Sequence, residues 1–315
     1  MKKENLTFLE QAELLQKRGI KIDDLERAAK KLETISYYKL KEFAEPFRIK
    51  DLKNEIKYAD ITFEDMIERY YQDKNLRIYL MHTIEKIEVS FKTRIAYNLG
   101  NLGSHAYLDT NKWIDRGNHP KKTNENENKI NKSNNKILEN NKSEFWKILE
   151  RYLPKYYNIN SDDGILYKEP DSVWIFINKL TFGEAIKIYE LMSYNRKKSI
   201  ANYYQLNVKE LNSWIKAIKL IRNLCAHNDT IIDFKFKTKP ILKSNWKDYL
   251  TDLDNQDSSH LALVILIIKY FVDIINPKYN YTNIKKELKR ITSNSNKKAV
   301  RIGFKNKSSI KKLHL

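Results

Sequence analysis

An arginine and a histidine stand five residues apart in one segment, Arg222-Asn223-Leu224-Cys225-Ala226-His227. A guanidinium stays protonated in proteins, and its fork of N–H donors matches the oxygens of a phosphate group. An imidazole ionises at about pH 6.5 in water, so it can accept or donate a proton near neutral pH. The two side chains could therefore stabilise a phosphate and move a proton, which is the chemistry of phosphodiester cleavage.

This spacing is not specific by itself. About 0.7 matches to Arg-x(4 to 6)-His are expected by chance in a chain of this length and composition. A second match runs from Arg77 to His82 through four apolar or aromatic residues. We interpret the Arg77 match as chance because nothing polar flanks it.

A helix is predicted around Arg222. It begins at Asn207, which forms a capping pattern with Glu210 three residues later. On a helical wheel, six apolar residues share one arc of about 100°: Leu211, Trp214, Ile215, Ile218, Ile221 and Cys225. Arg222 lies near the middle of that arc, so its guanidinium must meet a carboxylate, backbone carbonyls or a bound anion.

The helical geometry separates the two candidate side chains. Arg222 and His227 lie about 140° apart on an ideal helix, whereas Asn223 and His227 are four residues apart and share a face. Either the helix ends or distorts near Cys225, or the two side chains meet in a composite site with a second subunit. Asn223 is then the residue that could orient the imidazole. Cys225 itself is expected to be a packed core residue.

A second, longer helix is predicted from Thr62, which forms a capping pattern with Asp65, to Gly100, because no Gly or Pro interrupts this stretch. Its apolar arc also carries four charged residues: Asp73, Arg77, Glu85 and Glu88. Charges in an apolar stripe imply internal salt bridges, such as an i,i+4 pair between Asp73 and Arg77, or else a polar site.

The carboxylates of this helix leave two alternatives for Arg222. Glu85 or Glu88 could form a structural ion pair with the guanidinium, which would then have no catalytic role. The same two carboxylates could instead orient the guanidinium within a catalytic site.

The whole chain is predicted to be all-α, because seven Gly and six Pro in 315 residues disfavour sandwiches and barrels. We divide it into an N-terminal helical lobe (1–57), a helical domain (58–280) and a basic C-terminal tail (281–315). Further helices are expected at 144–157, 172–192 and 260–275. Residues 117–143 are nearly all Asn, Lys, Glu and Ser and are predicted to be a disordered insertion, with an RNA-contacting or gating loop as the alternative.

The charge balance favours a polyanionic partner. Fifty-nine basic and 40 acidic residues give a net charge of +19, which suits nucleic acid first and an anionic membrane second. Most of the basic residues are lysines, so we take the positive charge as compatible with a polyanionic partner and not as evidence for one. One cysteine and five scattered further histidines form no metal-ligand pattern. We predict no metal, no cofactor, no membrane segment and a cytoplasmic location.

The sequence resembles the Abi family of bacterial abortive-infection proteins, of the AbiD and AbiF type, within the HEPN superfamily. The similar stretches occur in the expected order and cover most of residues 30–235: SYYKL at 36–40 with PF at 46–47, DKNLR at 73–77, IEKIE at 84–88, TRIAY at 93–97, LTFG at 180–183 with Leu191, and RNLCAH at 222–227.

The resemblance implies an all-helical HEPN fold and a metal-independent ribonuclease whose Arg-x(4 to 6)-His motif is catalytic, usually across a two-fold dimer. The motif falls on Arg222 and His227, with Asn223 as the polar residue after the arginine. We therefore expect an endoribonuclease toxin of antiphage defence, active as a homodimer on RNA and controlled by a small structured RNA. The alternative is a catalytically silent RNA-binding or interaction module.

Overall fold

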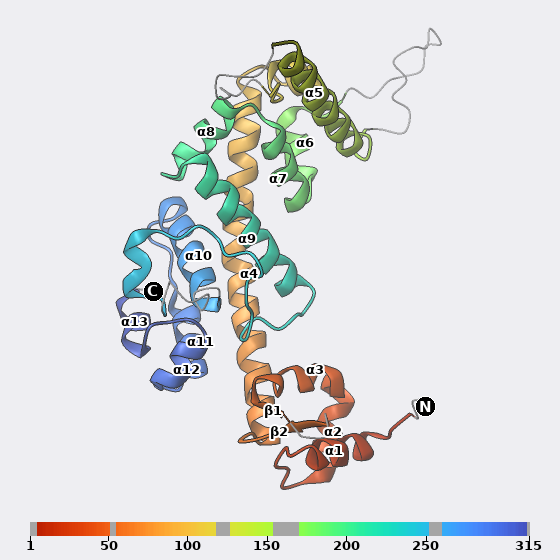
Figure 1. Cartoon of the computed structure of the whole chain (residues 1–315), viewed down its shortest axis with the longest axis vertical. Helices are drawn as coiled ribbons and strands as arrows, with labels where there is room; N and C mark the ends of the chain where they lie inside the picture. The colour runs from red at the N-terminus through yellow and green to blue at the C-terminus, as the bar shows by residue number, and fades with distance from the viewer. Residues whose placement is uncertain (1–4, 51–54, 118–126, 154–169, 252–259, 314–315) are drawn as a thin grey trace. The chain divides into compact units, whose positions relative to one another are not determined.

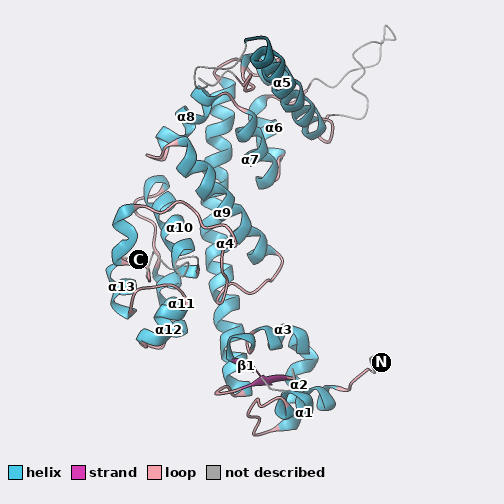
Figure 2. Cartoon of the chain, in the orientation of Figure 1, coloured by secondary structure: helices cyan, strands magenta, loops and turns pink. Residues whose placement is uncertain are grey.

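The computed structural model describes residues 5–50, 55–117, 127–153, 170–251 and 260–313. Thirteen α-helices and one antiparallel hairpin of two short strands form the regular structure of these residues, and Figure 2 shows how far helices dominate. The predicted all-α class is confirmed. Among the described residues, no helix combines the length and the apolar character needed to cross a bilayer.

The elements follow one another as α1 (Phe8–Lys17), α2 (Leu25–Ile35), α3 (Tyr37–Glu42), β1 (Arg48–Lys50), β2 (Ile56–Tyr58), α4 (Phe63–Gly100), α5 (Glu127–Leu149), α6 (Val173–Lys179), α7 (Phe182–Leu191), α8 (Tyr194–Tyr203), α9 (Val208–Ala226), α10 (Leu261–Ile275), α11 (Thr282–Thr292), α12 (Asn296–Arg301) and α13 (Lys307–Lys312). Short 3₁₀ turns, including one at Glu45–Phe47, connect some of them.

The chain divides into two compact units. Unit 1 contains Met1–His82, Ile221–Leu266 and Asn280–Leu315, and unit 2 contains Thr83–Leu220 and Ile267–Tyr279. Three helices, α4, α9 and α10, contribute residues to both units. Both ends of the sequence thus belong to unit 1, together with the Arg222 to His227 segment.

The N-terminal part of unit 1 consists of α1, α2, α3 and the β1–β2 hairpin (Figure 1). The short helices predicted there are present, and their apolar residues Leu15, Leu32 and Leu40 are fully buried. The turn after α1 contains Gly19, which has a positive φ of 95°, and a Cβ atom there would lie 2.4 Å from the Tyr58 carbonyl oxygen. Glycine is therefore the residue that fits this turn.

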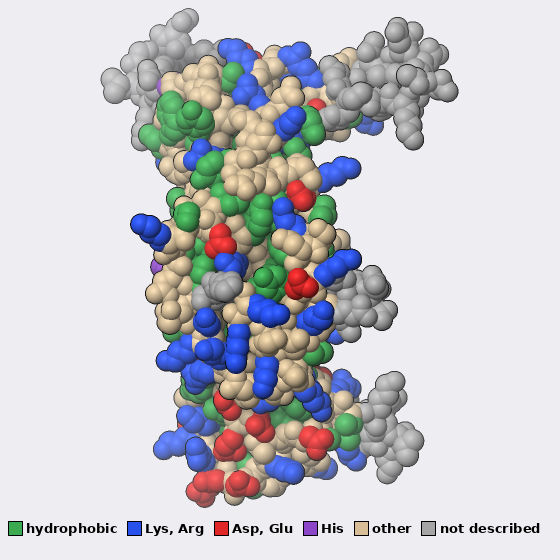
Figure 3. All heavy atoms as spheres, turned by 90° about the vertical axis from the view of Figure 1, so that its left-hand side faces the viewer, with side chains coloured by type: hydrophobic (Ala, Val, Ile, Leu, Met, Phe, Trp, Pro, Cys, Tyr) green, Lys and Arg blue, Asp and Glu red, His purple; other side chains and the backbone are tan. Residues whose placement is uncertain are grey.

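The basic C-terminal segment is folded into α11, α12 and α13, which also belong to unit 1. One side of these helices is apolar and buried, with Ile284, Leu288, Ala299 and Ile310 each at most 3% exposed. Their lysines and arginines lie on the other side, and Figure 3 shows basic side chains gathered over this part of the surface.

Helix α4 confirms the predicted 38-residue helix. Its start has the expected reciprocal cap: the Thr62 N–H donates to Asp65 Oδ2 at 2.9 Å, and the Asp65 N–H donates to Thr62 Oγ1 at 3.0 Å. Two of the charges assigned to its apolar arc are not buried. Glu85 is exposed, and Glu88 forms an i,i+4 ion pair with Lys92 at 2.9 Å.

The predicted disorder of residues 117–143 is wrong for residues 127–143, which lie in α5; residues 118–126 lie outside the described residues. The C-terminal end of α5 explains the difference. Phe145 is fully buried, and its ring contacts that of Trp113 at a centroid distance of 5.1 Å. Composition correctly describes the polar stretch as unable to form a core, but a helix anchored at one end can extend through it.

The predicted 172–192 helix is two helices. The chain is extended at Leu180, and Thr181 then begins α7 with a capping box, in which its side chain and that of Glu184 each accept the other's backbone N–H. The predicted apolar helix at 260–275 is α10, most of which is buried.

Candidate active site

The Arg222 to His227 segment forms the C-terminal end of α9. The His227 N–H donates to the Asn223 carbonyl at 2.9 Å, so helical hydrogen bonding continues to the histidine. Asn228 then takes a left-handed conformation with φ of 61°, and the Asp229 N–H donates to the Leu224 carbonyl at 2.9 Å. This 6→1 bond and the left-handed residue form a Schellman C-cap, which fixes the point at which the helix ends.

A regular helix keeps Arg222 and His227 on different faces. Because hydrogen bonding is helical up to the His227 amide, the five-residue spacing gives about 140° of rotation. The helix ends at Ala226, one residue after Cys225, as one of the predicted alternatives had it, but its hydrogen bonding shows no distortion before His227. His227 is exposed, and Arg222 and Asn223 are half-buried.

A buried carboxylate on α4 holds the chain just beyond this helix end. Asp73 is completely buried, and its Oδ1 atom accepts hydrogen bonds from the backbone N–H groups of Ile231 and Ile232 at 2.8 and 2.9 Å. Its Oδ2 atom accepts from Nε of Arg77 at 2.8 Å. Burial raises the pKa of Asp73, while these donors act in the opposite direction. The predicted Asp73–Arg77 pair is confirmed.

Two further residues of α4 hold the same loop. The Arg77 residue is 5% exposed, and its Nη1 atom donates to Oδ1 of Asn228 at 2.8 Å. One turn before Asp73, the Arg69 guanidinium pairs with the Asp233 carboxylate. Arg69, Asp73 and Arg77 are four residues apart and thus share one helical face. We call these three residues the α4 clamp, and they hold the loop formed by residues 228–233.

The N-terminal lobe reaches this loop as well. The Thr230 hydroxyl donates to the Glu42 carboxylate, and Nζ of Lys39 donates to Thr230 Oγ1 at 3.2 Å and pairs with Glu42 at 2.8 Å. Three of the sequence stretches that suggested a family, 36–40, 73–77 and 222–227, therefore contribute to the end of α9 or to the contacts of the loop that follows it.

The clamp was only partly predicted. Residues Asp73 and Arg77 were identified as an internal pair, but their bonds to the 228–233 loop were not. The spacing 69, 73 and 77 is the signal that could have revealed a charged face on α4. Arg77 is engaged by Asp73 and Asn228, which agrees with the interpretation of the Arg77–His82 spacing as chance.

The thiol of Cys225 belongs to the core, as expected. The residue is 8% exposed, and burial raises the pKa of its thiol to about 12. A protonated, buried thiol is a poor nucleophile. Among the described residues, no group of three or more His, Cys, Asp or Glu side chains is arranged to hold a metal ion.

Comparison with known proteins gives one family. The family model described as Abi-like protein matches residues 30–233, which include the α4 clamp, the end of α9 and the loop that follows it. No curated protein and no solved structure matches the chain.

Proposed function

The chain belongs to the Abi-like protein family, and from this premise we propose that it is a metal-independent endoribonuclease of abortive-infection defence. The family itself suggests the role in defence. The ribonuclease activity is our inference from the residues of the candidate site. It is consistent with the net charge of +19, since RNA is a polyanion.

The proposed reaction uses the 2′-hydroxyl of RNA as its nucleophile. His227 takes the proton of that hydroxyl while its oxygen attacks the adjacent phosphorus. Arg222 stabilises the negative charge that develops on the phosphoryl oxygens. The bond from phosphorus to the 5′-oxygen breaks, and an acid returns a proton to this leaving oxygen. The products are a 2′,3′-cyclic phosphate and a 5′-hydroxyl.

A homodimer would bring the two groups together. Because Arg222 and His227 lie on different faces of α9, we infer that Arg222 of one copy meets His227 of another. The same imidazole, once it has taken the hydroxyl proton, can return a proton to the leaving oxygen. Asn223 shares a face with His227 in the same copy, and we assign it the orientation of the imidazole.

The observation that best supports the proposal is the set of hydrogen bonds that fixes the end of α9 and the loop after it. An exposed histidine at a helix terminus can act in catalysis only if its backbone is held in place. Here, a Schellman cap fixes the end of α9, and the loop after it is bonded to a carboxylate that is completely buried. Burying the charges of Asp73 and Arg77 costs folding free energy. This cost is understandable if catalysis requires the loop to be held in one position.

Control by RNA completes the proposal. An unregulated ribonuclease would damage its own cell, so the resting enzyme must be restrained. We propose that a small structured RNA binds the protein and restrains it. The basic face of α11 and α12 suits such a partner, because lysine and arginine side chains neutralise phosphates.

The test is cleavage of a labelled single-stranded RNA by the full chain in EDTA, comparing wild type, Arg222→Ala, His227→Ala and His82→Ala. His82→Ala is the matched control, because it removes another exposed histidine from an Arg-x₄-His spacing. We expect His227→Ala to lose roughly 10²- to 10⁴-fold in rate and His82→Ala to retain full activity. Equal cleavage by His227→Ala and wild type would refute the assignment.

A silent RNA-binding module is the second candidate, supported by the same basic surface. Wild-type protein that binds RNA tightly but yields no cyclic phosphate in any RNA tested would favour it over catalysis.

A further inference from the structure

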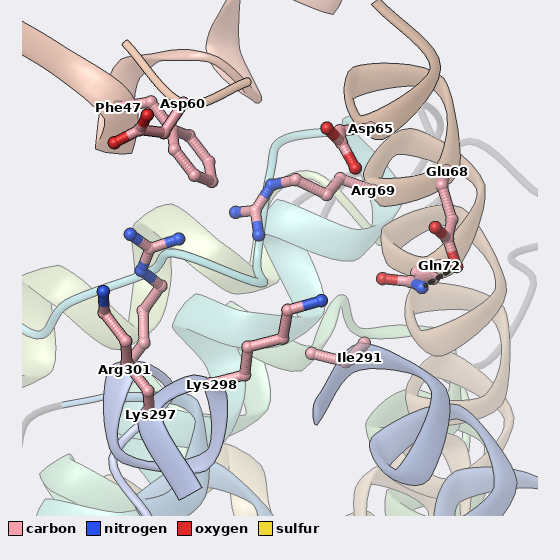
Figure 4. Close-up of a pocket in the computed structure, with 10 residues that line it drawn as sticks. All are labelled: Phe47, Asp60, Asp65, Glu68, Arg69, Gln72, Ile291, Lys297, Lys298 and Arg301. Atoms are coloured by element: carbon pink, nitrogen blue, oxygen red, sulfur yellow. Dashed lines mark hydrogen bonds between the residues drawn. The ribbon is translucent and has the colours of Figure 1, made fainter. Parts of the chain in front are cut away.

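A cavity of about 270 Å³ lies in unit 1, apart from the end of α9. It is bordered by Phe47, by the first turns of α4 and by α11 and α12 (Figure 4). We call it the α12 pocket and define it by four cationic residues, Arg69, Lys297, Lys298 and Arg301. Figure 4 shows these side chains reaching into a common space.

Three carboxylates also border the α12 pocket: Asp60 is exposed, and the other two accept hydrogen bonds. Asp65 accepts hydrogen bonds from Thr62 as the cap of α4, and Glu68 accepts one from Gln72 at 2.8 Å. Within the described part of the chain, no carboxylate lies at ion-pair distance from Lys297, Lys298 or Arg301. Nζ of Lys298 donates to Oγ of Ser293 at 3.2 Å, but an ammonium has three N–H donors, so these three cations can still bind an anion.

Two guanidinium groups are held close together at one aromatic ring. Cζ of Arg301 lies 4.5 Å from the centre of the Phe47 ring, and Cζ of Arg69 lies 5.5 Å from it. Burial lowers the pKa of Arg301, and the nearby Arg69 charge lowers it further, while Asp233 opposes this. Of the two, only Arg69 has a carboxylate of the described chain at ion-pair distance, Asp233, so two neighbouring guanidiniums with one paired carboxylate favour an additional anion.

The surroundings of the pocket carry the same sign of charge. Residues 281–315 contain eleven Lys or Arg and one Glu. A neighbouring cavity of about 530 Å³ shares Lys297 and Arg301 and adds Lys235 to its lining. The α12 pocket thus opens within a basic surface, which suits a polyanion longer than a single phosphate.

We propose that the α12 pocket binds a phosphate of an RNA chain, away from the bond that is cut. Forked guanidiniums bind phosphate oxygens in pairs, and lysines add point charges around them. Only the choice of RNA as the source of the phosphate rests on the proposed function. Because Arg69 also pairs with Asp233, the pocket and the end of α9 contact the same loop, and RNA held in the pocket is tethered beside the candidate active site.

The experiment measures binding separately from cleavage. A fluorescent single-stranded RNA is titrated with the full chain in EDTA at several salt concentrations, and fluorescence anisotropy gives the affinity. The test variant is Lys297→Ala/Lys298→Ala on α12. The matched control is Lys311→Ala/Lys312→Ala on α13, which removes the same charge from exposed positions outside the pocket.

We expect the α12 variant to bind RNA about tenfold more weakly and to have a salt slope smaller by about 0.7, since each phosphate contact on a single strand contributes about 0.7. The α13 variant should change both values much less. Arg301→Lys, which keeps the charge and removes the fork, should also weaken binding. Equal losses in the two double variants would overturn the proposal, because they would indicate general charge attraction.

A competition arm identifies the source of the phosphate. Inorganic phosphate and adenosine monophosphate are added to the wild-type complex and to the α12 variant. We expect neither to displace RNA at micromolar concentration; displacement from wild type that the α12 variant lacks would instead assign the pocket to a free nucleotide or phosphate. Loss of binding in the α12 variant would support the pocket even if the wild type failed to cleave RNA, so the two proposals fail separately.

Discussion

Removing the charge of Asp73 should release the loop that follows the candidate histidine. In Asp73→Asn, the Arg77 guanidinium, which is 5% exposed, loses its carboxylate, and breaking a buried pair from one side costs about 3–5 kcal/mol. Arg77→Met should cost a similar amount. In the double variant, neither charge is buried without its partner. Its loss of unfolding free energy should therefore be smaller than the sum of the losses in the two single variants by about 2 kcal/mol or more.

The assay is thermal and urea unfolding combined with hydrogen exchange of the peptide that covers residues 228–233. The Ile231 and Ile232 amides donate to Asp73, so a loss of about 3–5 kcal/mol corresponds to exchange that is roughly 10²- to 4 × 10³-fold faster. The control pair is Glu139–Lys142, a solvated i,i+3 pair at 3.1 Å, whose removal should cost less than about 1 kcal/mol. Additive single losses, or unchanged exchange in Asp73→Asn, would refute the clamp.

Three further predictions follow from the same unit. Burial raises the pKa of Asp73 and Arg77 opposes that shift, so Arg77→Met should raise the pKa further. The folded variant then holds the proton more tightly than the unfolded chain, and its loss of stability relative to wild type should grow in unfolding measurements as the pH rises above about 4. With the pKa of Cys225 at about 12, less than about 0.1% of the thiol is ionised at pH 8, and alkylation should require unfolding. Gly303→Ala should cost at least about 1–2 kcal/mol in thermal unfolding, because φ is 95° and the added Cβ would lie 2.8 Å from that of His260.

The long helices were predictable because their signals are local. The cap at Thr62 and the absence of Gly and Pro up to Gly100 were sufficient to define α4. The i,i+4 spacing likewise identified the pair between Asp73 and Arg77. Such features depend on residues within one or two turns of each other, and the sequence displays them directly.

The remaining parts depend on contacts between distant segments. Asp73 bonds to backbone amides about 158 residues later in the chain, and a backbone amide has no sequence signature. The α12 pocket likewise joins Phe47, Arg69 and Arg301. The Asn-rich part of α5 was mispredicted for a related reason, since composition does not reveal that Phe145 anchors the helix at its far end.

Complementation between two inactive variants tests most directly whether Arg222 and His227 act together across two copies. Arg222→Ala and His227→Ala are each purified, mixed in equal amounts, allowed to exchange subunits and assayed for cyclic-phosphate products in EDTA. A mixed dimer holds one intact site, so the mixture should recover about a quarter of the wild-type rate. A mixture no more active than either variant alone, although mixed dimers form, would contradict the composite site.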